Sequence, residues 1–207
     1  MPGRDGRSGG PARGNKSPDT ASLHDAAIAY VARYAATEAS LLRMLEQRIM
    51  RWAANAKASG MDHRALAAQV DAAKHAARDI VARLAEIGAV NDADFAETRA
   101  RNLLRAGRSY RAIDAYLAAK GVTAEVRRTI SSGHQTNAEL AAALVLAHRR
   151  RIGPYRRGDG PDIQGRRQEL TIFARAGFPL SIATQALEVA LDEAEELVRR
   201  LRLTGDS

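Results

Sequence analysis

Apolar residues recur at intervals of three and four along most of the chain, and this period predicts α-helices. In residues 37–59, Leu41, Leu45 and Ile49 follow one another at spacings of four, and in residues 63–87 the apolar positions approach a heptad repeat. No stretch of the sequence shows the alternation with a period of two that predicts a β-strand. The pattern therefore predicts an all-α protein.

Capping and turn signals separate these helices. Short side chains that accept hydrogen bonds from the amides of a first helical turn precede three of them, at Thr37, at Asn91 or Asp92, and at Ser109. Three alanine-rich helices are followed by a glycine, as expected where a helix ends in a left-handed residue: Gly60, Gly121 and Gly177. Because proline is favoured in a first helical turn, the last helix is expected to begin at Pro179.

The apolar positions after Pro179 continue at spacings of three and four, through Leu187, Leu191, Ala194, Val198 and Leu201. This unbroken pattern predicts one helix to the end of the folded region.

The segments around the three glycines resemble one another, which indicates an internal repeat. AKASGMD, LAAKGVT and FARAGFP each carry alanine and a basic residue before the glycine and an apolar residue after it, and the glycines lie 61 and 56 residues apart. Two helical segments precede each glycine and one follows it. The sequence therefore predicts an elongated array of three tandem three-helix repeats: repeat 1 at 23–88 with extended helices, repeat 2 at 89–133, and repeat 3 at 134–204 with a loop rich in Gly, Pro and Arg at 152–165.

Residues 1–22 differ in composition from the rest of the chain. They are rich in glycine, proline, serine and arginine, so burial cannot offset the entropy of ordering them, and we expect a disordered basic tail. The chain has no cysteine, which excludes disulfides and thiolate chemistry, and neither a signal peptide nor a membrane-spanning run is found. We therefore expect a cytoplasmic protein that does not enter a membrane.

The balance of charge points to an acidic partner. A formal net charge of +8 and an isoelectric point near 10.4 are typical of proteins that bind nucleic acid or an acidic protein surface. In repeat 2, Glu97, Arg101, Arg105 and Arg108 fall on one predicted helix face, where Glu97 can pair with Arg101. This face is the first candidate contact surface.

A second basic group lies in repeat 3. Eight arginines between residues 149 and 175 are opposed in that stretch only by Asp159, Asp162 and Glu169, and Tyr155 among them can stack on a nucleobase. The candidate contact residues of the two groups together are Arg101, Arg105, Arg108, Arg111, Lys120, Arg149, Arg150, Arg151, Arg156, Arg157, Arg166, Arg167 and Arg175.

The sequence carries no pattern that predicts catalysis. The five histidines are scattered without ligand spacing, so no metal site is expected. Neither a GxxxxGK[ST] nor a GxGxxG phosphate loop occurs, and no Ser/His/Asp arrangement can be argued. We therefore expect a protein that is not an enzyme and that uses no cofactor.

The stretch EIGAVNDADFAETRARNLLRAGRSYRAIDAYLAAKGV resembles the RecX family of bacterial recombination regulators. The resemblance rests on a glycine, a short apolar pair, an acidic turn, a Phe-Ala dipeptide, an arginine-rich helix and a helix ending in Lys-Gly: Gly88, Ala89-Val90, Asn91-Asp92, Phe95-Ala96, Arg99 to Arg105, Gly107 and Lys120-Gly121. It extends more weakly over residues 25–200. Ala89 departs from the pattern, because an aromatic residue is common at that position in the family.

This resemblance implies a regulatory protein that binds the RecA recombinase, usually its filament on single-stranded DNA. Such a protein is expected to lower the ATPase and recombinase activities of RecA, and so to temper recombination and the SOS response. The implied partners are RecA, its nucleoprotein filament and single-stranded DNA itself, and a monomer is expected. Whether the effect is inhibition or another modulation, and which basic residues touch RecA rather than DNA, stays open.

Two other classes also stay open. Three short helices resemble a helix-turn-helix unit, which would make the protein a direct DNA-binding regulator that reads base edges in a duplex. Nearly all exposed positions are Arg or Ala, however, and these favour contacts to the DNA backbone over base readout. A helical-repeat adaptor for other proteins is the second class, and its binding should persist at high salt because apolar contacts would dominate.

Overall fold

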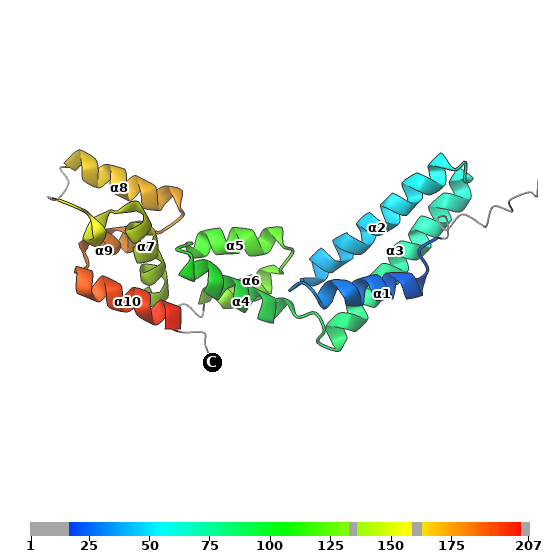
Figure 1. Ribbon diagram of the computed structural model, residues 1–207, viewed down its shortest axis with the longest axis horizontal. Helices are drawn as coiled ribbons and strands as arrows, with labels where there is room; N and C mark the ends of the chain where they lie inside the picture. Colours follow the sequence, from blue (N-terminus) through cyan, green and yellow to red (C-terminus); the bar gives the residue numbers. More distant parts are fainter. Residues whose placement is uncertain (1–16, 133–135, 159–162, 204–207) are drawn as a thin grey trace, which may run out of the picture. The chain divides into compact units, whose positions relative to one another are not determined.

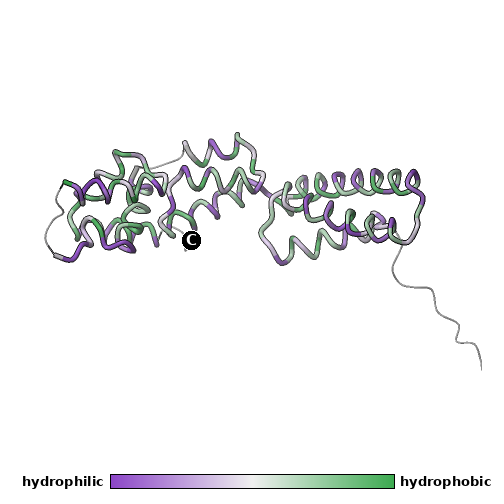
Figure 2. The backbone as a smooth tube through the Cα atoms, turned by 90° about the horizontal axis from the view of Figure 1, so that it is seen from above, coloured by the Kyte–Doolittle hydropathy of each residue, from purple (hydrophilic) through white to green (hydrophobic). Residues whose placement is uncertain are grey.

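The computed structural model describes residues 17–132, 136–158 and 163–203. In these residues it contains ten α-helices, one short 3-10 helix and no β-strand (Figure 1). Hydrophilic and hydrophobic positions interleave along the helices, as the sequence pattern requires (Figure 2). The all-α prediction is confirmed. The chain divides into two compact units, residues 1–90 and residues 91–207, which are called unit 1 and unit 2 below.

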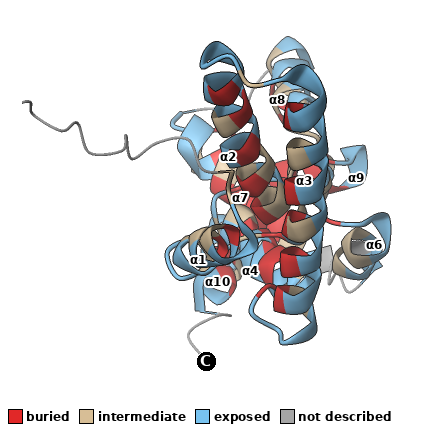
Figure 3. Cartoon of the chain, turned by 90° about the vertical axis from the view of Figure 1, so that its right-hand side faces the viewer, coloured by how far each residue is buried: buried red, intermediate tan, exposed pale blue. Residues whose placement is uncertain are grey.

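Unit 1 is built from three helices that pack on one another: α1 (Thr20–Val31), α2 (Glu38–Ala58) and α3 (His63–Glu86). Buried positions recur along α2 and α3, and the core includes Leu23, Leu45 and Ile80 (Figure 3). Thr37 caps α2 as predicted, because its Oγ1 accepts a hydrogen bond from the Ser40 amide at 3.1 Å.

Helix α1 begins inside the segment that we predicted as tail. Asp19 caps it by accepting a hydrogen bond from the Ser22 amide at 2.8 Å, so residues 20–22 form its first turn. Residues 1–16 of the predicted tail lie outside the described residues.

Unit 2 contains seven α-helices and the 3-10 helix in its described residues: α4 (Asp92–Arg105), α5 (Tyr110–Ala119), α6 (Ala124–Ser132), α7 (Thr136–Arg150), η1 (Gly153–Tyr155), α8 (Ile163–Arg175), α9 (Leu180–Glu188) and α10 (Leu191–Leu203). Asn91, rather than Asp92, caps α4, because its Oδ1 accepts hydrogen bonds from the amides of Ala93 and Asp94. Ser109 caps α5 as predicted.

Helix α7 forms the centre of unit 2. Every residue from Leu140 to Val145 is buried, so the middle of this helix has no polar face and must be covered on all sides. It packs against α4, α9, α10 and η1. One cluster of buried residues therefore runs from Phe95 of α4 to Leu201 of α10, and the stretches predicted as repeats 2 and 3 share this core.

The prediction of one last helix after Pro179 is wrong. The chain forms two helices, α9 and α10, with Val189 between them in an extended conformation (φ −63°, ψ 143°). The apolar positions keep the same helical spacing on both sides of Val189, so this spacing does not reveal the break. Leu191, one of these positions, is nevertheless 48% exposed. Asp192 and Glu193 in the first turn of α10 are the missed signal, since acidic residues favour a helix N-terminus.

The stretch 134–204 differs from its prediction in two further ways. Its described residues form four α-helices instead of three, because the predicted last helix is divided. The expected loop at 152–165 contains η1, and α8 begins within it at Ile163. Within the predicted repeats, α5 and α6 follow Gly107, and α9 and α10 follow Gly177. Gly177 therefore matches Gly107 in helix order rather than Gly121. The division of the whole chain into three repeats stays a prediction.

A hydrogen bond from a buried hydroxyl joins two turns of unit 2 that are distant in sequence. The fully buried Ser109 donates from Oγ to the carbonyl oxygen of Ala176 at 2.7 Å, so the α4–α5 turn meets the α8–α9 turn. Gly177 permits this approach, because a Cβ at its position would lie 2.8 Å from Ser109 Oγ. Its φ of +86° also favours glycine. These two turns are called the junction below.

We expect Gly177→Ala to lower the free energy of unfolding by about 2–4 kcal/mol, because left-handed strain adds to the loss of the hydrogen bond that the buried Ser109 hydroxyl donates. Gly158→Ala is the matched control in the same unit: its φ is +91° and nothing lies within 4 Å of the added Cβ. Strain alone should cost this control about 1 kcal/mol. Urea unfolding followed by circular dichroism measures both variants, and equal losses would contradict the proposed close contact.

Candidate functional site

The structure separates the predicted basic residues by what their side chains contact. Five of them contact other groups of the fold through hydrogen bonds, ion pairs or ring contacts: Arg105, Lys120, Arg149, Arg156 and Arg166. The others are exposed, and Arg101 among them bonds within its own helix: Arg101, Arg108, Arg111, Arg150, Arg151, Arg157, Arg167 and Arg175. The sequence does not display this division, because most of the partners are distant in sequence.

Arg156 is part of the scaffold. It forms an ion pair with Glu169 of α8, whose residue is only 7% exposed, and so ties the chain after η1 to α8. The second carboxylate oxygen, Glu169 Oε2, is buried and has no hydrogen-bond partner in the described part of the chain. Removing Arg156 would leave a buried uncompensated charge, which makes this pair a structural requirement.

Arg166 is also paired. Its Nη2 lies 2.6 Å from Glu188 Oε1, so the ion pair joins α8 to α9. Glu188 is not among the carboxylates predicted to oppose the arginines, because it lies 22 residues farther along the chain. Asp159 and Asp162, which are among them, lie outside the described residues.

Two further arginines bind backbone carbonyls at helix ends. Arg105 Nε donates to Leu201 O of α10 at 3.3 Å, and Arg149 Nη1 donates to Ala106 O after α4 at 3.2 Å. A cation near a helix C-terminus is favoured by the helix dipole. Arg105 and Arg149 therefore help to hold α4, α7 and α10 together, and Arg149 stays exposed while doing so.

Lys120 and Arg101 make local contacts. Lys120 Nζ lies 5.7 Å from the centre of the Tyr116 ring, within range of a cation–π interaction. Arg101 Nη2 lies 3.4 Å from Thr98 Oγ1, one turn earlier on α4. Both side chains therefore lie close to their own helices.

The junction brings together arginines that are far apart in sequence. Arg108 precedes Ser109, and Arg175 precedes Ala176, so the Ser109–Ala176 hydrogen bond places these two positions at one site. Arg111 lies there as well, because its Cβ is 3.5 Å from the position of a Cβ at Gly177. In the part of the chain that the structure describes, the side chains of these three arginines form no ion pair or hydrogen bond. They are called the junction arginines below.

A carboxylate also approaches the junction from α7. Glu139 Oε1 accepts a hydrogen bond from the Tyr110 amide at 3.3 Å, at the N-terminus of α5. Burial raises the pKa of Glu139, while this hydrogen bond acts to lower it. Burial and the charge of Glu139 raise the pKa of Tyr110 to about 12. Tyr110 is therefore a neutral phenol at physiological pH.

Some basic residues of unit 2 were not predicted as candidates. Arg127 pairs with Asp114 at 2.6 Å and joins α6 to α5, so it belongs to the scaffold. Arg199 and Arg202 lie on α10, where sequence analysis considered only the apolar stripe. The run of three arginines at 199, 200 and 202 was the signal available for them.

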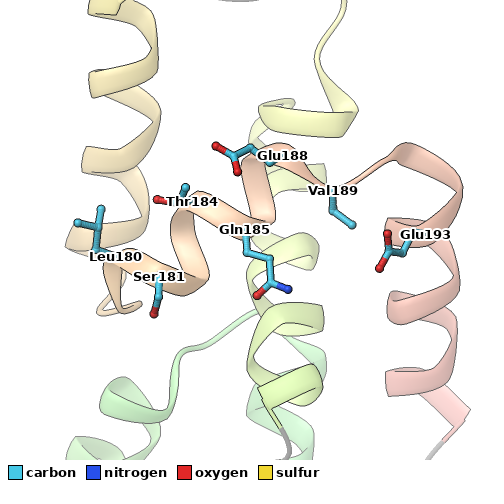
Figure 4. Close-up of a pocket in the computed structure, with 7 residues that line it drawn as sticks. All are labelled: Leu180, Ser181, Thr184, Gln185, Glu188, Val189 and Glu193. Carbon is cyan, nitrogen blue, oxygen red and sulfur yellow. The ribbon is translucent and has the colours of Figure 1, made fainter.

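A pocket of about 670 Å³ lies along α9, and Figure 4 shows its lining side chains. Glu188 and Glu193 are the charged groups of this lining, and Glu188 already pairs with Arg166. The pocket therefore has the opposite charge to the candidate contact surface. Among the described residues, no three His, Asp or Glu side chains stand together as a metal site would require, and no helix is long and apolar enough to cross a membrane.

Arg151 occupies a backbone conformation that normally favours glycine. Its φ is +57°, and it ends α7 with the Ile152 amide donating to Ala147 O at 3.1 Å. The equivalent positions after α4 and α8 are Gly107 and Gly177. A side chain in this conformation is strained, and such strain is most often tolerated where the side chain has a function.

We expect Arg151→Gly to raise the free energy of unfolding by about 0.5–1 kcal/mol, because relief of left-handed strain exceeds the added chain entropy of glycine. The neighbouring Arg150→Gly is the control and should lower it by about 0.5–1 kcal/mol, since Arg150 is helical. Urea unfolding curves give both values. A loss of stability in Arg151→Gly would show that the side chain stabilises the fold.

Comparison with known proteins identifies relatives of this chain. Residues 91–129 match the family model described as RecX, second three-helix domain, which corresponds to α4–α6. The regulatory protein RecX of Myxococcus xanthus is 35% identical over 181 residues, covering 85% of this chain and 91% of that protein. RecX of Agrobacterium fabrum is 35% identical over 112 residues, covering 54% and 59%. RecX of Mycobacterium tuberculosis is 32% identical over 119 residues, covering 56% and 68%. No solved structure matches the chain.

Proposed function

Because this chain belongs to the RecX family of regulatory proteins, we propose that it binds RecA or its filament on single-stranded DNA and lowers the ATPase and recombinase activities of RecA. The observation that carries the proposal is the exposed arginine set of unit 2, in particular the junction arginines, Arg108, Arg111 and Arg175. These charges are not needed to neutralise carboxylates of the fold itself, so they are available to an acidic partner.

The construction of unit 2 supports the proposal. Ion pairs and backbone hydrogen bonds use Arg156, Arg166 and Arg105 to hold the helices, while the junction arginines stay at the surface. Guanidinium groups bind carboxylates and phosphates through directed pairs of hydrogen bonds. A RecA filament presents both groups, as acidic side chains and as the DNA backbone. One compact unit that carries several such cations can bind them at once.

The expected effect on RecA follows from such binding. A protein bound across neighbouring RecA subunits would hinder the changes between them that ATP hydrolysis and strand exchange require. The role is regulatory and non-catalytic, and we propose that the protein acts as a cytoplasmic monomer that tempers recombination and the SOS response.

We expect the unaltered protein to inhibit the single-stranded-DNA-dependent ATPase of RecA. Charge reversal at all three junction arginines, Arg108→Glu, Arg111→Glu and Arg175→Glu, should raise the concentration needed for half-inhibition at least tenfold. This change corresponds to a loss of about 1.4 kcal/mol of binding free energy. Inhibition by the unaltered protein should weaken as salt is raised, because exposed charges are screened.

The matched control reverses three exposed arginines of α3 in unit 1, Arg64, Arg78 and Arg83, and changes the net charge by the same amount. It should keep most of the inhibition. If both triple variants lost inhibition equally, the junction would be excluded from the interface with RecA.

If the unaltered protein left RecA activity unchanged and bound one duplex sequence tightly, the protein would be a direct DNA-binding regulator, and this proposal would be replaced. Inhibition that persists at high salt would indicate an interface with RecA that apolar contacts dominate, rather than exposed charges.

A further inference from the structure

A second pocket of unit 2 combines aromatic, apolar and basic groups. It has a volume of about 640 Å³ and lies between the end of α7, η1 and α10. Val145, Val198 and Leu203 contribute apolar side chains to its lining. His148 and Tyr155 are the aromatic residues of the lining, and Arg149, Arg199 and Arg202 are its basic residues. The residues come from segments about 50 positions apart and meet because α10 packs on α7.

The two rings of the pocket form an ordered pair. The ring centres of His148 and Tyr155 lie 4.8 Å apart with an angle of 87° between their planes, which is a favourable edge-to-face arrangement. Tyr155 is partly buried, and burial together with Glu195 raises its pKa, while Arg202 acts to lower it. Tyr155 is therefore a neutral phenol at physiological pH and offers an uncharged aromatic surface.

The charge of the pocket is positive. Three arginines of the lining stand against two carboxylates, Glu195 in the lining itself and Glu196, which pairs with Arg199. Arg149 is fixed by its hydrogen bond to Ala106 O, and Arg199 is anchored by an ion pair with Glu196. Arg150 and Arg151, both exposed, follow Arg149 directly, so the basic surface continues beyond the pocket.

We propose that this pocket binds one nucleotide unit of single-stranded DNA, with the base against the His148–Tyr155 pair and the adjoining phosphates at Arg149, Arg199 and Arg202. Stacking on aromatic rings and cationic contact with phosphates are the two interactions by which proteins hold single strands without sequence preference. The carboxylates of an acidic peptide would use the arginines but not the aromatic and apolar lining. A free nucleotide would leave the basic surface beyond the pocket unused.

This inference rests on the proposed function for its choice of DNA and assigns a site to direct contact with the strand. It adds His148, Arg199 and Arg202 to the candidate contact residues, and it places the Tyr155 ring against His148.

The test measures binding of a fluorescent oligothymidylate to the full chain, without RecA, by fluorescence anisotropy at low salt. We expect Tyr155→Leu and Arg202→Gln each to raise the dissociation constant at least fivefold. Tyr155→Phe, which keeps the ring, should stay within twofold of the unaltered protein. Arg128→Gln removes an exposed arginine of α6, outside the pocket, and is the matched control, also expected within twofold. Circular dichroism confirms that each variant is folded.

Unchanged affinity in both Tyr155→Leu and Arg202→Gln would overturn the proposal, as would no measurable binding of oligothymidylate. If free dTMP displaced the oligothymidylate at an equal concentration of nucleotide units, the pocket would be assigned to a free nucleotide instead. If poly-glutamate displaced the oligothymidylate equally well from the unaltered protein and from Tyr155→Leu, the pocket would be assigned to an acidic protein. Inhibition of RecA by a protein that binds no DNA would overturn this inference alone. DNA binding without inhibition of RecA would overturn the proposed function alone.

Discussion

The burial of α7 is the constraint on which unit 2 depends. A helix with six consecutive buried residues cannot face water on any side, so α4, α9, α10 and η1 must cover it. This covering joins segments from Asp92 to Leu203 into one core. Basic residues that are 60 or more positions apart in sequence are thereby carried by one body, which lets them meet one partner at fixed relative positions.

The same packing decides which arginines remain available. Where a carboxylate or a helix C-terminus lies close, as at Glu169 for Arg156 and at Leu201 for Arg105, the guanidinium becomes part of the scaffold. At the junction, Ser109 Oγ is already used by the Ala176 carbonyl, and Glu139 accepts a hydrogen bond from the Tyr110 amide rather than pairing with an arginine. The neighbouring arginines therefore stay exposed. A count of charges in the sequence overstates the binding surface, because it includes cations that the fold itself needs.

Much of the fold could be predicted from local signals. The helical period, the caps at Thr37 and Ser109 and the glycine-ended turns are set by residues within one or two turns, so the sequence displays them directly. The break at Val189 escaped prediction because the apolar spacing continues in phase across it. The Ser109–Ala176 contact and the Arg166–Glu188 pair also escaped, since tertiary packing alone brings these residues together. The pocket at Tyr155 was foreseen only as a single aromatic residue among arginines.

The central claim is that the junction of unit 2 contacts the RecA filament, and site-specific photocrosslinking tests it most directly. A photoreactive phenylalanine replaces the exposed Ala174, next to Arg175, and in a second protein the exposed Ala67 of α3 in unit 1. After irradiation with RecA filaments on single-stranded DNA, the account predicts a RecA crosslink from position 174 that is lost when salt abolishes binding. A crosslink from position 67 with none from position 174 would contradict it.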